Sequence, residues 1–245
     1  FDFCSAPFFI CQKEKIALGR FASKAPFPNQ VGDMADILIP TVAQGLMWAL
    51  MALGVYITFR VLDIADLSVE GSFPLGAAVA ATALVSGYGV TAAFLLAAVA
   101  GALAGIVTGI LTTKLKIPPL LAGILTMIGL YSVNLHVMGK ANVALLRVDT
   151  VFSYAAGMGL TSDMAMMAVG LVGVMLVGVI LYWFFGTELG TAIRATGCNS
   201  QMARAQGVNT NSMIVLGLLI SNALVALSGA LVCQANGFAD VCMGT

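Results

Sequence analysis

Charged side chains are scarce in this chain. Of its 245 residues only 9% are Asp, Glu, Lys or Arg, whereas 60% are hydrophobic. A soluble domain carries about 25% charged residues, so a chain this apolar lacks the polar groups needed to cover a water-exposed surface. Together with a mean hydropathy of +1.01, this composition excludes an ordinary soluble protein and predicts an integral membrane protein.

An excess of positive charge is missing too. The 11 basic residues balance the 11 acidic ones, so the charge gives no reason to expect nucleic acid as a partner. The 5 cysteines form no Cys-x-x-Cys pair, and the single histidine, His136, cannot complete a ligand set of usual spacing. We therefore expect no metal and no cofactor.

Motifs that carry catalysis are also missing. There is no Gly-x-x-x-x-Gly-Lys-Ser/Thr loop, so we expect the chain not to hydrolyse ATP by itself. His-Glu-x-x-His and Gly-x-Ser-x-Gly are missing as well. We predict that the chain is not an enzyme, while a membrane enzyme or a non-transporting scaffold stays open as an alternative.

Long uncharged runs are what the sequence has instead. A spanning helix takes about 20 predominantly apolar residues. Such runs occupy 37–59, 71–113, 117–139, 164–187 and 213–234, and the second is long enough for two spans broken near Ser86–Gly89. We predict an all-α integral membrane protein, a multi-span helical bundle of about six spans. Gly101, Gly105 and Gly109, four residues apart, predict a close approach between two of its helices.

The loops predict the orientation of the bundle. Lys114, Lys116, Arg60 and the stretch from Arg194 to Arg204 fall on one side if six spans alternate. Positive loops favour the cytoplasm, so we expect this side to be cytoplasmic. Basic residues before the first span argue against its starting outside, and a re-entrant second segment would reconcile the two.

Polar and helix-breaking residues mark a candidate translocation pathway. Pro74 follows a glycine-containing segment and cannot donate a backbone hydrogen bond, which predicts either a broken or late-starting helix beside a cavity or a plain loop with a helix beginning near Pro74. Polar groups near the end of the fourth predicted span face either solute or other helices. The candidate pathway residues are Glu70, Gly71, Ser72, Phe73, Pro74, Asn134 and His136.

The segment 188–209 is long for a connection between two spans, since helix–helix loops usually have about 2–8 residues. Leu189, Ile193 and Thr196 recur at helical spacing, and Gly197 can end that helix. Asn199 or Ser200 can cap a second short helix through Ala205, which Gly207 would end. We predict two short surface helices, which either form a connector without a partner or dock onto a soluble motor.

This segment resembles the cytoplasmic coupling segment of ATP-binding-cassette (ABC) permeases of the branched-chain amino acid and simple-sugar importer type. Those permeases carry a pattern like Gly-x-Ala-x-Arg-Ala-x-Gly-x-Asn-x-x-x-Ala-x-x-x-Gly. The matching residues are Gly190, Ala192, Arg194, Ala195, Gly197, Asn199, Ala203 and Gly207. Two more stretches, 62–73 and 121–142, look like a bacterial subgroup of uncharacterised or aromatic amino acid importers, and the resemblance runs from residue 37 to 245.

The resemblance implies a function and a set of partners. It implies the membrane-spanning subunit of an importer of a small polar solute, with an amino acid first among the solutes, in the inner membrane of a bacterium. Its partners would be a cytoplasmic ATP-binding cassette subunit, a second permease copy, an external solute-binding protein and membrane lipid. The residues implied in the ATPase contact are Gly190, Arg194, Ala195, Gly197, Asn199, Ala203 and Gly207.

Some expectations concern the chain ends and the energy source. Residues 1–36 form an N-terminal segment of unclear origin, of which 1–32 resemble no known segment. Relatives continue with further spans beyond Thr245, so we expect a fragment whose permease domain is 37–245. An ion-coupled secondary transporter is the main alternative. It needs carboxylates within its spans, and the predicted spans have none.

Overall fold

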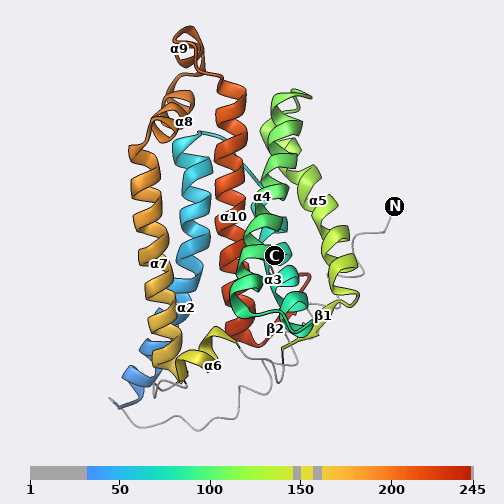
Figure 1. Cartoon of the computed structure of the whole chain (residues 1–245), viewed down its shortest axis with the longest axis vertical. Coiled ribbons are helices and arrows are strands. Elements are labelled where there is room, and N and C mark those ends of the chain that lie inside the picture. The colour runs from blue at the N-terminus through green and yellow to red at the C-terminus, as the bar shows by residue number, and fades with distance from the viewer. Residues whose placement is uncertain (1–31, 146–149, 157–161, 244–245) are drawn as a thin grey trace. The chain divides into compact units, whose positions relative to one another are not determined.

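The computed structural model describes residues 32–145, 150–156 and 162–243 (Figure 1). The chain divides into two compact units, Phe1–Leu38 and Ile39–Thr245. Residues 32–38 of the first unit form the start of helix α2, whereas 1–31, most of the predicted N-terminal segment, lie outside the described residues. The following description concerns the second unit.

Long apolar helices make up most of this unit. They are α2 (Gly32–Tyr56, extended by the π-helical turn η2, Ile57–Val61), α4 (Val90–Thr113), α5 (Pro119–Met138), α7 (Ser162–Gly186) and α10 (Thr210–Asn236). These 5 are long and apolar enough to cross a membrane. A sixth apolar helix, α3, covers Val69–Val85. All six predicted apolar helices are therefore present, and the predicted break at 86–89 is confirmed between α3 and α4.

Helix α3 crosses only part of the bundle. Its 17 residues span about 26 Å, less than the roughly 30 Å of a bilayer core. The non-helical residues 62–68, here called the linker, lead from η2 into the bundle to the start of α3 (Figure 1). Helix α3 then continues away from η2 toward the opposite end of the bundle (Figure 1).

Helix α3 begins earlier than the sequence predicts. It starts at Val69, five residues before Pro74, and continues through that proline. Both expectations, a break and a helix beginning near Pro74, are wrong. Pro74 lies in the second turn of the helix, where its missing N–H removes one hydrogen bond near the end and leaves the rest intact.

Helix α10 is the centre of the unit. In the apolar stretch of α10, 61% of the residues are buried, whereas in that of α7 only 17% are buried. Three glycines of α4, namely Gly101, Gly105 and Gly109, rest on the backbone or side chains of α10, which confirms the close approach predicted from their spacing. Gly76 of α3 meets α10 in the same way. Small residues thus bring three helices into backbone contact.

Two serines join α10 to α2. Ser221 Oγ donates a hydrogen bond to the Gly54 carbonyl at 2.7 Å, and Ser228 Oγ donates to the Met47 carbonyl at 2.8 Å. Both the donors and the acceptors lie seven residues apart, two helical turns, on antiparallel helices. These bonds fix the register of α2 on α10.

Short elements close the two ends of the bundle. At one end, β1 (Asn142–Ala144) pairs antiparallel with β2 (Phe238–Asp240), beside the short helix α6 (Val151–Ala156). At the other end lie α8 (Glu188–Cys198) and α9 (Ser200–Ala205), here called the elbow (Figure 1). Helices α2 and α4 both end at the elbow end (Figure 1), and Arg60 in η2 and Lys114 and Lys116 after α4 follow these helix ends, as the alternation of spans predicts.

Candidate functional site

The elbow is built by capping residues. The Thr187 side chain caps α8 by accepting from the Gly190 N–H at 3.5 Å. Asn199 Oδ1 accepts from the N–H groups of Gln201 and Met202 at 3.1 and 3.0 Å, which starts α9. Gly207, with φ +86°, follows α9 in the left-handed conformation that ends it. The two predicted short helices are thus confirmed, and so are the cap of the second helix at Asn199 and its end at Gly207.

Gly197 has a different role from the one expected. It lies inside α8, which ends at Cys198, so the prediction that it stops this helix is wrong. A Cβ atom at this position would overlap the Val61 carbonyl oxygen and lie 3.0 Å from the Leu62 Cα. Glycine here lets α8 lie directly against the start of the linker. Ile193, one turn earlier, is buried in a cluster with Ile57 and Leu62.

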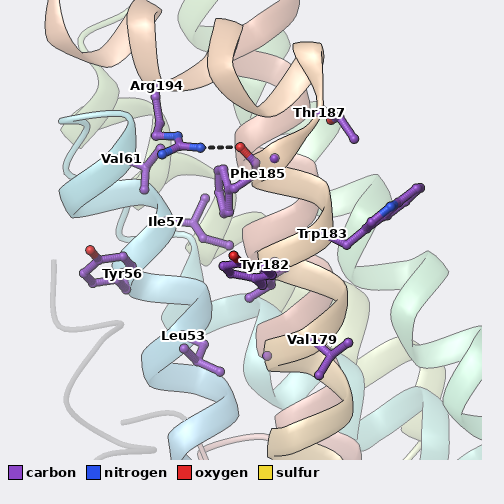
Figure 2. Close-up of a pocket in the computed structure, with 13 residues that line it drawn as sticks. Leu53, Tyr56, Ile57, Val61, Val179, Tyr182, Trp183, Phe185, Thr187 and Arg194 are labelled. Carbon is purple, nitrogen blue, oxygen red and sulfur yellow. Dashed lines mark hydrogen bonds between the residues drawn. The ribbon is translucent and has the colours of Figure 1, made fainter.

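Arg194 reaches back to the helix that precedes the elbow. Its guanidinium donates to the Phe185 carbonyl near the end of α7 and lies over the Phe185 ring, 5.7 Å from the centroid (Figure 2). A cation at the end of a helix satisfies a free carbonyl and interacts favourably with the helix dipole. Arg194 therefore holds the α7–α8 corner, while its side chain stays exposed.

The other predicted coupling residues occupy two environments. Gly190 packs on the backbone of Phe184 and Phe185, and Ala203 is buried. Ala195, Asn199 and Gly207 are exposed. The buried members shape the elbow, whereas the exposed ones form its outer surface.

An open groove beside the elbow marks the edge of the apolar zone. It has a volume of about 970 Å³, runs between α2 and α7, and carries Arg194 as its single charged lining residue (Figure 2). Tyr56, Tyr182 and Trp183 are exposed along it. Tyr and Trp gather where a membrane meets water, so exposed rings at this position are typical of a membrane boundary. The apolar lining suits lipid chains rather than a polar solute.

The candidate pathway residues do not form one site. Gly71 of α3 packs on Met127 and Leu130 of α5, and Asn134 Nδ2 donates to the Gly71 carbonyl at 3.4 Å. Asn134 Oδ1 is buried without a partner. His136, two residues further along α5, is exposed on another face of this helix. The structure therefore brings Asn134 to α3 and leaves His136 apart.

The remaining pathway candidates differ in exposure. Ser72, Phe73 and Pro74 are buried, and the Phe73 ring stacks on Trp48 with centroids 5.2 Å apart. Glu70, in the first turn of α3, is exposed. The three buried residues thus support the packing of α3, whereas Glu70 lies at the surface.

A buried polar network lies where the linker meets α3. The Ser68 N–H donates to Asp66 Oδ1 at 2.8 Å, and Asn222 Nδ2 of α10 donates to Asp66 Oδ2 at 3.1 Å. Ser68 Oγ donates to Asn222 Oδ1 at 3.2 Å, which closes the ring. Asp66 is 2% exposed. A buried carboxyl costs free energy unless its oxygens are hydrogen-bonded, and here both are.

Sequence reasoning missed this network. The sequence analysis gives Asp66 no role of its own within the stretch 62–73, and Asn222 lies in the uncharged run 213–234. Two signals were present: Asp66 and Ser68 have the spacing of a side-chain turn, and Asn222 is a polar residue in the middle of an apolar run. The network makes the linker continuous with α10, since Asn222 contacts both Asp66 and Ser68.

Comparison with known proteins assigns the family. Residues 37–244 match the family described as "Branched-chain amino acid transport system / permease component". The chain belongs to this family. The permease is similar to the tyrosine transport system permease protein of Clostridioides difficile, with 42% identity over 207 residues that cover 84% of this chain and 68% of that relative. No solved structure matches it.

Two other relatives show how far the similarity extends. An uncharacterized protein of Rickettsia prowazekii, RP368, is 36% identical over 209 residues, which cover 85% of this permease and 72% of that protein. The autoinducer 2 import system permease protein LsrC of Yersinia pestis is 31% identical over 198 residues, which cover 77% of this permease and 52% of that relative. The permease is thus the membrane-spanning component of an ABC-type importer and not an enzyme, as the sequence predicts.

Proposed function

We propose that this permease carries an amino acid inward across the cytoplasmic membrane of a bacterium, driven by an ATP-binding subunit that docks on the elbow. The 42% identity to a tyrosine permease supports an amino acid as the solute, against 31% to an autoinducer permease. The basic residues at the elbow end support a cytoplasmic elbow. The family implies an ATP-binding subunit and a solute-binding protein, and we propose a second permease copy as well.

The contact between Gly197 and Val61 is the observation that carries this proposal. It joins the elbow to the linker without a side chain between them. A displacement of α8 would thereby be transmitted to the linker. From the linker it would reach α3 and α10 through the contact between Asp66 and Asn222. We propose Gly190, Arg194, Ala195, Gly197, Asn199, Ala203 and Gly207 as the coupling set. The start of α3, from Glu70 to Pro74, with Asn134 and His136, is proposed as the part that opens or closes the pathway.

The full-length permease, reconstituted with its ATP-binding subunit and binding protein, tests this function. We expect ATP-dependent uptake of tyrosine into proteoliposomes. The Gly197→Ala variant should lose at least tenfold of this uptake while it still binds the ATP-binding subunit, because a Cβ atom at 197 overlaps Val61. Gly186→Ala is the matched control, since a Cβ atom there meets nothing within 4 Å. Full uptake by Gly197→Ala would contradict the coupling role.

One observation favours a second candidate, an ion-coupled transporter. Such a protein needs a carboxyl group inside its bundle, and Asp66 supplies one that the sequence had not placed there. Both Asp66 oxygens are held by hydrogen bonds, which argues against a loosely bound ion. Uptake that a protonophore abolishes and ATP depletion leaves unchanged would decide for this candidate.

A further inference from the structure

A polar cavity opens where the elbow meets the linker. It has a volume of about 420 Å³. Leu62, Asp63 and Ile64 of the linker form one wall, residues 196–201 of the elbow form the other, and Ile214 of α10 contributes to the lining. We call this cavity the seam. A side chain of a partner protein that enters the seam would contact the elbow and the linker at the same time.

Asp63 is the single carboxylate that lines the seam, and its backbone is unusual. Its φ of +55° lies in the left-handed region, which non-glycine residues seldom adopt and Asp and Asn tolerate best. Hydrogen bonds on both sides hold this conformation, since Leu62 N donates to Ile57 O and Ile64 N donates to Thr58 O, each at 3.0 Å. A residue held in such a conformation is often part of a functional site.

The Asp63 carboxylate is available for a partner. It is exposed, and within the part of the chain that the structure describes no hydrogen bond or ion pair engages it. The opposite wall supplies uncharged polar side chains, among them Ser200 and Gln201. A lysine or arginine side chain carries several donors and no acceptor, so a cavity that holds a carboxylate together with amide and hydroxyl oxygens suits it.

The charges around the seam favour one site for such a cation. Five basic residues lie at the elbow end: Arg60, Lys114, Lys116, Arg194 and Arg204. They repel a cationic partner group over much of this end. Two exposed carboxylates there attract it, Glu188 at the start of α8 and Asp63, and of these two only Asp63 lines the seam. Attraction at a few points combined with repulsion around them restricts the position in which two proteins meet.

We propose that the seam receives a lysine or arginine side chain of the ATP-binding subunit, which pairs with Asp63. This inference rests on the proposed function, because it needs an ATP-binding subunit at the elbow end. It adds a contact on the linker itself, outside the segment 188–209 that the family resemblance singles out. Through this contact the partner reaches the linker directly as well as through Gly197.

Cys198 gives a direct test, because it is an exposed thiol that lines the seam. In the full-length permease we would replace Cys4, Cys11 and Cys242 by serine and keep the fully buried Cys233. Maleimide labelling of Cys198 should slow at least tenfold when the ATP-binding subunit is bound. A Lys140→Cys, Cys198→Ser variant places the thiol just after α5, at the end of the bundle opposite the elbow. Its labelling rate should be the same with and without the ATP-binding subunit.

Substitutions of Asp63 separate its charge from its backbone. Asp63→Asn keeps a side chain that tolerates positive φ and removes the charge, and it should weaken binding of the ATP-binding subunit about tenfold. Asp63→Glu keeps the charge and should bind more tightly than Asp63→Asn despite the backbone strain. Asp240→Asn, the same change at the opposite end, should leave binding unchanged.

The outcomes distinguish this inference from the proposed function. A complex in which Cys198 labels at the free rate, or in which Asp63→Asn binds as tightly as the parent, overturns the seam contact and leaves the proposed function in place. The absence of any complex between the permease and its ATP-binding subunit overturns both.

Discussion

The Asp66 carboxyl lies inside a predominantly apolar bundle, where it accepts two hydrogen bonds from a ring of three. One neighbour, Ser68, is two residues away, whereas Asn222 is 156 residues away in the chain. Asn222 serves as donor to Asp66 and as acceptor for Ser68, so the removal of this one amide breaks two sides of the ring. The network therefore depends on a single side chain of α10.

Asn222→Leu should destabilise the permease. The substitution leaves an Asp66 oxygen and the Ser68 hydroxyl buried without their partner, which costs about 1–3 kcal/mol. We expect a lower midpoint of thermal unfolding in detergent. Asn211→Leu, at an exposed position in the first turn of α10, should change the free energy of unfolding by less than about 0.5 kcal/mol.

A double substitution tests whether the cost arises from the unpaired carboxyl. Asp66→Leu combined with Asn222→Leu removes both partners, so the double variant should be less destabilised than the sum of the single variants. Additive losses would show that the two residues act independently.

The sequence alone could not have shown this network as a whole. The polar character of Asn222 and the spacing of Asp66 and Ser68 are visible in the sequence, but their contact depends on how α10 packs against the linker. Gly197 shows the same limit. A glycine near the end of a short helix predicts a stop, and only the packed structure reveals that Val61 occupies the space of its missing side chain.

At the scale of elements, small residues set the spacing between helices. The glycines of α4 contact α10 without intervening side chains, and the serines of α10 donate to carbonyl groups of α2. In lipid, helices gain little from burying apolar side chains against each other, because the surrounding chains are equally apolar. Close backbone contact and hydrogen bonds between helices therefore determine the packing here.

Gly105→Ala should separate α4 from α10. Its Cβ atom would overlap the Leu218 backbone and lie 2.8 Å from the Leu219 Cα, so we expect a loss of about 1–3 kcal/mol of unfolding free energy, as for overpacked cores. Unfolding in SDS would measure it. Gly129→Ala in α5 adds the same methyl group where nothing lies within 4 Å; an equal loss there would contradict the steric explanation.

The elements themselves follow well from the sequence. Uncharged runs predict the six apolar helices, and Asn199 and Gly207 predict the limits of α9, because apolar periodicity and capping are local properties. The start of α3 and the β1–β2 pair were not predicted. Pro74 is tolerated because it lies early in its helix, and the two strands have three residues each and lie far apart in the chain.

At the scale of the whole molecule, the two ends of the bundle differ in charge and in construction. The elbow end carries five of the described basic residues and two capped helices, whereas the opposite end is closed by a strand pair. This asymmetry is the basis for placing the elbow in the cytoplasm.

Labelling in intact cells tests this orientation. With the native cysteines replaced, a membrane-impermeant maleimide should label Lys140→Cys in intact cells and Ser200→Cys only after the cells are permeabilised. Both positions are exposed and lie at opposite ends of the bundle. Labelling of Ser200→Cys in intact cells would place the elbow outside and contradict a cytoplasmic motor.

The central position of α10 also has a consequence for biosynthesis. This helix supplies the surface on which α2, α3 and α4 pack, yet the ribosome completes it after all of them. Until Thr210–Asn236 leaves the ribosome, the glycines of α4, the Met47 and Gly54 carbonyl groups and the Asp66 carboxyl have no partner helix. Helix α3 can already pack on α5 at this stage, through Gly71 and Asn134, but the surfaces of α2, α3 and α4 that face α10 stay without their partner until the last described helix joins them.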